Sequence, residues 1–460
     1  MPIYNTWVRI LISAGEASGE MYGAQLMEAL WAESVHVGTG VPARPAERSS
    51  ETLKPALNPD RIEFFGVGGD KMRAAGCDIV VDSKDLAVVG ITEIFGHLPR
   101  IWGLFHKLIA EADQRKPDVA IVIDSPAFNW RVARQMHKRG IPVVYYVCPQ
   151  FWAWRQGRVR LLRKYVDKAL VIFPFEEKFY RDRGVDAEFV GHPLAELSKP
   201  SITRDQYAAE NGLVAAKPWI TLMPGSRVKE VRINLPGMIE SARMLGSEYE
   251  FLLPVAPTLD ENHIEHLVNL SLATDASEVN SIGKGTAFSR AENHSMPTDG
   301  TTESRALPAS APGQNSYGIH LVPEALPALA HSRAGIIASG TATVEAALMD
   351  LPFVMVYRVT PLTYILGRSM VKVPHFAMVN LIAGEQVVPE LVQEDFTPEK
   401  VTAEIRKIIP ESEARKRMLE GLKEVRLRLE GDQESHVHAA DRAARAIFAL
   451  WQARNAQKTL

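Results

Sequence analysis

The sequence is poor in cysteine, with only Cys77 and Cys148 among its 460 residues. Two thiols cannot form a disulfide framework or a zinc cluster, so both are expected to be small buried side chains in a reducing, cytoplasmic protein. Nowhere do about 18 apolar residues follow one another, as a membrane-spanning helix requires. The first residues also lack the basic and apolar segments of an export signal. Any membrane contact is therefore expected to be peripheral.

Neither sign of charge is in large excess. The chain has 52 Lys and Arg against 55 Asp and Glu, and a formal net charge of -3. Because a dedicated nucleic-acid-binding protein is usually strongly basic, no nucleic-acid partner is expected. Hydrophobic residues make up 46% of the chain and charged residues 23%, which is typical of a globular protein of two or three domains with a full core.

Short apolar segments alternate with helical patterns along the chain. Strands that are apolar on both faces are typical of parallel sheets covered by helices on both sides. The alternation predicts an α/β protein of two doubly wound, Rossmann-like domains that face a central cleft, with ligands at the carboxyl ends of the strands. The expected strands are 8–13, 62–66, 119–124, 143–148 and 170–173 in the first domain, and 219–223, 251–254, 319–322, 335–338 and 353–357 in the second.

The alternation of strand and helix patterns also predicts the domain limits. The N-terminal domain is expected at 1–190 and the C-terminal domain at 191–434, with a final helix, 435–460, that could pack back on the first domain. Two stretches, 38–60 and 271–317, are polar and lack apolar periodicity. Such composition buries too little apolar surface to offset the entropy of ordering, so both are interpreted as surface insertions without chemistry.

One candidate phosphate-binding turn follows the expected strand at 219–223. Gly225 lets the backbone approach a ligand closely, Ser226 offers a hydroxyl, and Arg227 is a forked donor for phosphate oxygens. The start of the helix that follows favours anions as well. An ordinary Pro-Gly turn with a surface arginine is the alternative interpretation.

A second turn of the same kind follows the strand at 335–338. Ser339, Gly340 and Thr341 offer amide and hydroxyl donors at a helix start, and Glu345 in the next turn suits a ribose diol. Taken alone, this cluster could be only a helix cap. Two such turns in one domain indicate a diphosphate held from both sides, although no Walker motif is present.

In the first domain, small and acidic residues follow the first strand. Gly15, Glu16 and Ser18 leave room for a large ligand and offer acceptors for sugar hydroxyls, although Ser18 could be only a helix cap. Asp124 closes the strand 119–124 and is well placed to be a general base. The alternative for Asp124 is an Asx turn before Ser-Pro.

Aromatic and basic residues are interleaved from Gln150 to Arg158. Trp154 and Arg155 in this segment suit a membrane interface or a phosphorylated amphiphile. Buried tryptophans beside a solvated basic helix are the alternative interpretation.

With these motifs in order, the chain resembles the lipid-A-disaccharide synthases, inverting glycosyltransferases of family 19 with the two-domain GT-B architecture. The resemblance runs from about Ile10 to the C-terminal helices and is interrupted by the two polar insertions. Each motif is weak alone, and their order makes the match specific. The motifs are 13–19, 66–69, 123–126, 152–155, 189–193, 224–227, 338–342 and 380–384.

The resemblance implies a reaction between UDP-2,3-diacylglucosamine and 2,3-diacylglucosamine 1-phosphate, which gives a β-1,6-linked disaccharide 1-phosphate and UDP in lipid A biosynthesis. It implies that Asp124 is the base for the acceptor hydroxyl. The donor is then bound by Ser226, Arg227, Ser339, Gly340, Thr341, Glu345 and Asn380, and the acceptor sugar lies near Gly15, Glu16, Ser18, Trp154, Arg155 and His192.

Two departures from the family pattern bear on these roles. Glu20 stands where the first motif usually ends in Asp, and Ala127 stands where many relatives carry a second acid after Asp124. The assignment of the base therefore depends on Asp124 alone.

No Asp-x-Asp pair for a divalent ion is visible, so no cofactor and no metal are expected. The enzyme is expected to work peripherally on the cytoplasmic face of the inner membrane. Two alternatives stay open: another UDP-sugar enzyme of this architecture, such as an epimerase or a different transferase, and a peripheral membrane protein that only binds a sugar nucleotide.

Overall fold

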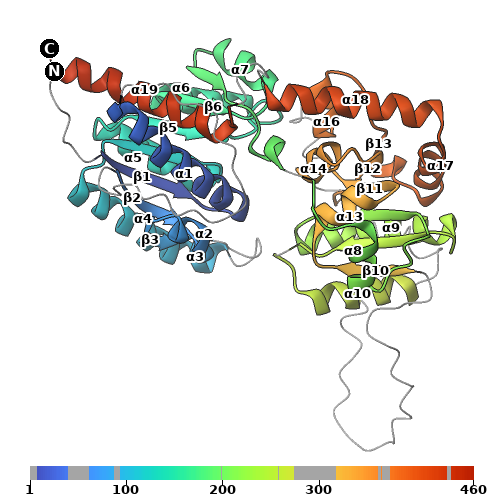
Figure 1. The fold of residues 1–460 in the computed structure, drawn as a ribbon. Helices are drawn as coiled ribbons and strands as arrows, with labels where there is room; N and C mark the ends of the chain where they lie inside the picture. The colour runs from blue at the N-terminus through green and yellow to red at the C-terminus, as the bar shows by residue number, and fades with distance from the viewer. Residues whose placement is uncertain are drawn as a thin grey trace, which may run out of the picture. The chain divides into compact units, whose positions relative to one another are not determined.

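The first of two sheets contains seven parallel strands in the order β3-β2-β1-β4-β5-β6-β7 (Figure 1). The computed structural model describes residues 8–39, 62–86, 94–197, 199–256, 258–273, 318–360, 364, 373–431 and 437–459. The strands are β1 Val8–Ala14, β2 Ile62–Gly68, β3 Asp78–Asp82, β4 Val119–Ile123, β5 Val143–Tyr146, β6 Lys168–Val171 and β7 Ala187–Phe189.

Helices cover both faces of this sheet. Successive side chains of a strand point to opposite faces, so Leu11 packs under α4 and α5, while its neighbours Ile10 and Ile12 lie on the other face. The described helices of this part are α1 Ala17–Thr39, α2 Asp70–Ala74, α3 Ser83–Leu86, α4 Ile94–Arg115, α5 Pro126–Lys138, α6 Val159–Tyr165, α7 Pro174–Arg181 and α19 Ala439–Thr459, with 3-10 turns η1 Gln156–Arg158 and η2 Pro193–Glu196.

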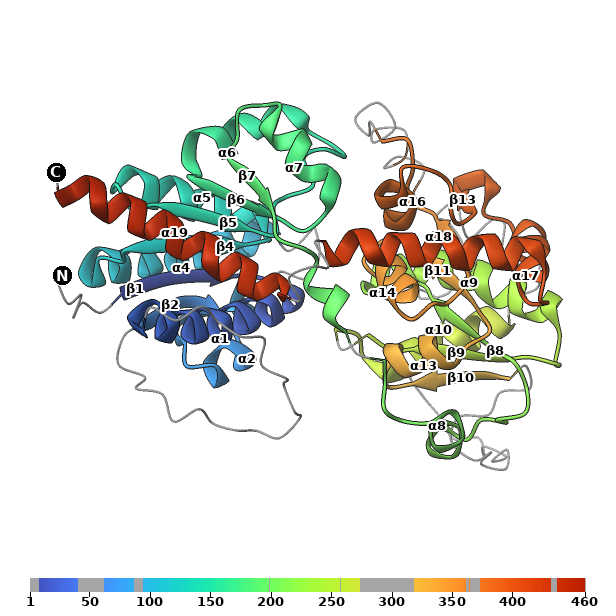
Figure 2. The same ribbon diagram turned by 45° about the horizontal axis from the view of Figure 1, so that its top comes forward.

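The end of the chain belongs to the first unit. The chain divides into Met1–Glu196 with Leu429–Leu460, and Leu197–Arg428. Helix α19 packs along α1, as both ribbon views show (Figure 2). At its start, Arg442 donates hydrogen bonds to the carbonyl oxygens of Val190 at 2.7 Å and Glu430 at 2.8 Å, which fastens the returning chain to the first unit.

The second unit has a six-stranded parallel sheet in the order β10-β9-β8-β11-β12-β13. Its strands are β8 Trp219–Met223, β9 Glu250–Pro254, β10 Ile319–Val322, β11 Ala334–Ala338, β12 Phe353–Tyr357 and β13 Glu390–Val392. Its described helices are α8 Arg204–Asn211, α9 Val228–Leu245, α10 Glu261–Ala273, α13 Ala325–His331, α14 Ala342–Leu348, α16 Met378–Ala383, α17 Pro398–Ile408 and α18 Glu413–Glu430, with a 3-10 turn η3 Gln393–Asp395.

The predicted architecture of two doubly wound α/β halves is confirmed. The division falls after Glu196 rather than before Gly191, because η2 and the returning chain pack with the first sheet. The first residues of the expected insertions end α1 and α10, and the rest, 40–60 and 274–317, lies outside the described residues. In the described part of the chain, no helix has the length and apolarity to cross a membrane.

Candidate functional site

The loops after β1 and β4 touch at the carboxyl edge of the first sheet. β1 pairs with β4, and a Cβ on Gly15 would lie 2.6 Å from the Ser125 hydroxyl, so a larger residue there would displace the Ser125 side chain. Asp124 and Ser125 both adopt the left-handed conformation, with φ of 46° and 44°. This conformation is uncommon for residues other than glycine and clusters at functional sites.

Buried Asn129 fixes this edge, and its role was missed in the sequence. Its Nδ2 donates to the carbonyl oxygens of Ile123 at 2.8 Å, Asp124 at 2.9 Å and Ser13 at 3.1 Å. Its Oδ1 accepts a hydrogen bond from the Ser13 hydroxyl at 2.7 Å. One amide therefore joins the ends of two neighbouring strands around the backbone of Asp124.

Tyr145 adds a further support to the same backbone. Its hydroxyl donates to the carbonyl oxygen of Asp124 at 2.8 Å, and burial raises the pKa of this phenol well above its usual range. The Asp124 residue itself is half-buried. The backbone of Asp124 is thus held by two buried side chains at a strand end, and its role as the base stays a prediction.

The predicted sugar contacts near α1 differ in exposure. Glu16 and Ser18 are exposed, whereas Gly15 is buried. Glu20 has a structural role, because its Oε1 accepts the amide of Lys71 at 2.7 Å and its carboxylate fills the space beside Gly69.

The aromatic segment after β5 is anchored by a buried acid. Trp152 is buried and donates from Nε1 to Glu176 at 2.8 Å, and Glu176 also accepts the amides of Ile172 and Phe173. Burial raises the pKa of Glu176 to about 7, against the opposing effect of these hydrogen bonds. The Trp-Ala-Trp-Arg segment therefore depends on a carboxylate that the sequence did not reveal.

Two residues of this segment reach the surface. The Trp154 side chain is 43% exposed, and the Arg155 guanidinium lies 4.5 Å from its ring centroid. Arg155 has a φ of 56°, so the chain turns sharply at this point. An exposed indole capped by a cation is a suitable contact for an amphiphilic ligand.

His192 lies in the interior. It is 1% exposed, its Nδ1 accepts the amide of Leu194 at 3.1 Å, and Phe173 packs against its ring. Burial lowers its pKa to about 3, so the imidazole is neutral at physiological pH. The expected role near the sugar stays a prediction, and this position favours an indirect effect through the turn that His192 holds.

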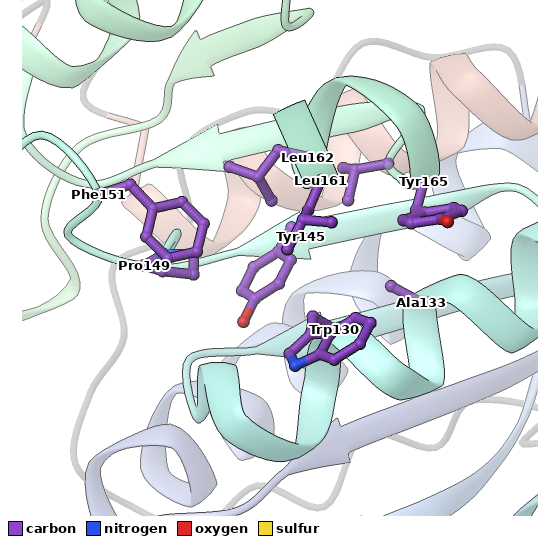
Figure 3. Close-up of a pocket in the computed structure, with 9 residues that line it drawn as sticks. Trp130, Ala133, Tyr145, Pro149, Phe151, Leu161, Leu162 and Tyr165 are labelled. Carbon is purple, nitrogen blue, oxygen red and sulfur yellow. The ribbon is translucent and has the colours of Figure 1, made fainter. Parts of the chain in front are cut away.

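A small apolar pocket opens between α5 and α6 (Figure 3). Trp130 and Tyr165 line it together with the buried Tyr145 and Phe151, and Phe151 lies at the side away from Tyr165. The same Tyr145 supports Asp124, so the pocket and the predicted base share a side chain.

In the second unit, the two predicted phosphate turns lie side by side. β8 pairs with β11 with Met223 opposite Ile337, so the turns that follow these strands emerge from adjacent positions at one edge. Neighbouring strands are about 4.8 Å apart. The turns that carry Arg227 and Ser339 therefore start from adjacent strands, and their contact with one ligand stays a prediction.

The first turn is already occupied by an acid of its own helix. Glu230 accepts the amide of Ser226 at 3.2 Å and pairs with Arg227 at 3.0 Å. A Cβ on Gly225, whose φ is 131°, would lie 2.6 Å from Glu230. A carboxylate of the same helix thus uses the donors that were predicted for a phosphate, and their binding of a phosphate stays a prediction.

Buried Asn234 joins this turn to the residue that follows β12. Its Nδ2 donates to the carbonyl oxygen of Pro224 at 3.0 Å, and its Oδ1 accepts the amide of Arg358 at 3.1 Å. Thr258 donates from its hydroxyl to the carbonyl of Ser226 at 2.8 Å. Neither support was visible in the sequence, because the partners are far apart along the chain.

The second turn is open. The Ser339 hydroxyl donates to the carbonyl of Phe376 at 2.8 Å, while Thr341 is exposed. A Cβ on Gly340 would meet nothing within 4 Å, and its φ is 147°. Burial raises the pKa of Glu345, which follows in α14.

Asn380 has an internal role. It is fully buried, its Nδ2 donates to Val388 and Glu390, and its Oδ1 accepts the amides of Val387 and Val388. Its side chain therefore supports the loop that carries Phe376, and the expected contact with the donor stays a prediction. Among the residues that the structure describes, no cluster of three or more His, Cys, Asp or Glu could hold a metal ion.

Two parallel α/β units with polar turns at their strand ends define a two-domain α/β class of fold. The fold matches UDP-GlcNAc 2-epimerase from Neisseria meningitidis with a TM-score of 0.54 at 11% identity, over 96% of this chain and 99% of that one. It matches the calicheamicin glycosyltransferase CalG4 with a TM-score of 0.50 at 14% identity, over 97% and 99%. These likenesses establish the GT-B fold.

Sequence relatives identify the family. The family model for lipid-A-disaccharide synthetase matches residues 10–287 and 312–447. The lipid-A-disaccharide synthase of Koribacter versatilis is 48% identical over 97% of this chain and 99% of its own length, and that of Acidobacterium capsulatum is 45% identical over 95% and 96%. The chain belongs to the lipid-A-disaccharide synthase family, which confirms the predicted glycosyltransferase.

Proposed function

We propose that the protein transfers a diacylglucosamine from UDP to diacylglucosamine 1-phosphate and forms a β-1,6-linked disaccharide. The observation that supports this proposal is the pair of turns with polar donors that follow the adjacent strands β8 and β11, in a chain that matches the family over nearly its whole length. The substrates are acylated, so the enzyme works peripherally at the cytoplasmic face of the inner membrane.

The reaction needs a base and a stabilised leaving group. Asp124 takes the proton of the acceptor 6-hydroxyl, whose oxygen bonds to C1 of the donor sugar. The bond between C1 and the diphosphate oxygen breaks, UDP leaves with the electron pair, and the configuration at C1 inverts. Arg227 and the backbone amides of Ser226, Gly340 and Thr341 stabilise the charge that develops on the diphosphate.

Glu230 sets a condition on donor binding. Because its carboxylate already accepts the Ser226 amide and pairs with Arg227, an incoming diphosphate replaces it at these donors. Displacement costs little at this exposed position, since exposed ion pairs contribute only about 0–1 kcal/mol. The roles of Glu345 at the ribose, and of Glu16, Ser18, Trp154 and Arg155 at the acceptor, are part of the same proposal.

The test is UDP release with both acylated sugars in detergent. Release is expected only when donor and acceptor are present together. Release from the donor alone would indicate hydrolysis, and conversion of unacylated UDP-N-acetylglucosamine without release would favour an epimerase. Binding of the donor with no turnover would favour a non-catalytic sugar-nucleotide protein.

A further inference from the structure

One segment of the first unit contains many basic residues and no acidic residue. Between Ser125 and Val166 the sequence contains nine Lys or Arg and no Asp or Glu, although the whole chain has a net charge of -3. The nine are Arg131, Arg134, Lys138, Arg139, Arg155, Arg158, Arg160, Arg163 and Lys164.

Most of these cations have no counter-charge. In the part of the chain that the structure describes, only Arg139 of the nine pairs with a carboxylate, that of Asp113 at 2.6 Å. The other eight side chains are exposed and lie on α5, η1, α6 and the turn before η1. We call these eight the basic surface.

Cations from two helices meet at one ring. The Arg134 guanidinium of α5 lies 6.0 Å from the Tyr165 ring centroid, and the Lys164 ammonium of α6 lies 5.4 Å from the same centroid. Like charges brought together without an acid repel one another, and an external anion relieves this repulsion. The basic surface is therefore complementary to an anionic partner.

Apolar groups lie among these cations. Trp130 and Tyr165 line the apolar pocket between α5 and α6, and Arg131 lies 5.1 Å from the Trp130 ring centroid (Figure 3). Trp154, 43% exposed, stands beside Arg155. Interleaved basic and aromatic side chains around an apolar opening are typical of a surface that lies on a lipid interface.

We propose that the basic surface docks on an anionic phospholipid bilayer, with its cations on lipid phosphates and its aromatic side chains at the level of the headgroups. The choice of a bilayer rests on the proposed function, because acylated substrates reside in one.

The experiment is flotation of the purified full-length protein with vesicles. Each basic side chain near an anionic surface contributes about fivefold to partitioning. The triple variant Arg134→Gln, Arg160→Gln, Lys164→Gln should therefore bind phosphatidylglycerol-containing vesicles roughly 100-fold more weakly than the unaltered protein. Raising the salt concentration should weaken binding of the unaltered protein, and pure phosphatidylcholine vesicles should bind little of either.

A matched control has the same net charge change elsewhere. Lys400, Lys407 and Lys416 are exposed on helices of the second unit, and their replacement by Gln should leave flotation unchanged. Equal flotation of the basic-surface variant and the control would overturn the proposal. So would a loss of RNA binding in the basic-surface variant while vesicle binding stays normal.

The two proposals fail in different ways. The basic-surface variant should keep UDP release from detergent-solubilised substrates, which also shows that it is folded. If the unaltered protein released no UDP but floated through the basic surface, the proposed function would fail and the docking would stand.

Discussion

Replacing Asn129 tests how the first unit holds its predicted base. In Asn129→Ala, the backbone around Asp124 loses the amide that joins it to β1, and the Ser13 hydroxyl loses its acceptor. The three contacts from Nδ2 share two amide hydrogens, and Oδ1 accepts one hydroxyl, so the four contacts amount to about three full hydrogen bonds. At about 1 kcal/mol each, local stability should fall by about 3 kcal/mol.

Hydrogen–deuterium exchange measures this loss where it occurs. A loss of about 3 kcal/mol corresponds to roughly 100-fold faster exchange of peptides that cover residues 119–129. Peptides of the second unit should be unchanged and serve as an internal control. The matched variant Ser13→Ala removes one hydrogen bond of the four contacts and should accelerate exchange only about fivefold.

The same variant should affect catalysis through geometry. Misplacing a catalytic group by about 1 Å can cost on the order of 100-fold in rate. We therefore expect Asn129→Ala to lower kcat by about that factor while UDP affinity stays normal. If Asn129→Ala matched Ser13→Ala in both exchange and kcat, the amide would not hold the backbone of Asp124, and the reasoning would be refuted.

The remaining predictions concern charge at the two units. Asp124→Asn should lower kcat by about 10²–10⁴-fold with UDP affinity retained, and near-normal turnover would remove the base assignment. By calorimetry, Arg227→Ala should weaken UDP binding, whereas Glu230→Gln, which removes the competing carboxylate, should tighten it. If the UDP affinity of either variant equals that of the unaltered protein, the placement of the diphosphate is contradicted. EDTA should leave activity intact, and a loss restored by magnesium would count against a metal-independent reaction. Because burial raises the pKa of Glu176 to about 7, the folded protein holds the Glu176 proton more tightly than the unfolded chain does. The protonated carboxyl therefore contributes fully to the free energy of unfolding below about pH 4.5, and this contribution is lost as the pH rises through 7. Glu176→Gln should flatten this decline in melts between pH 5 and 8, and an unchanged slope would refute it.

Much of the fold could be predicted because its central strands are buried on both faces. β1, β4 and β8 are apolar runs that end in turn residues, so strand, turn and helix were all visible in the sequence. The strands β3, β7 and β13 were missed. They lie at sheet edges and are only partly buried, so they carry no continuous apolar signal.

The candidate site was predictable where its residues follow strands directly. Asp124 directly follows β4 in the first sheet, and Ser339 and the turn with Arg227 follow β11 and β8 in the second, each at the carboxyl edge of its own sheet. Their supports were not predictable, because Asn234 and Glu176 act through partners that only the folded chain brings near. A buried amide or acid in a helix has no sequence signature that separates it from a surface residue.

Analysis of the product by mass spectrometry and NMR tests the central claim most directly. With both acylated sugars in detergent, the unaltered protein should form a disaccharide 1-phosphate with a β-1,6 linkage, and Asp124→Asn should form almost none. An α linkage, a product joined at another hydroxyl, or equal product from both proteins would contradict an inverting transfer in which Asp124 is the base.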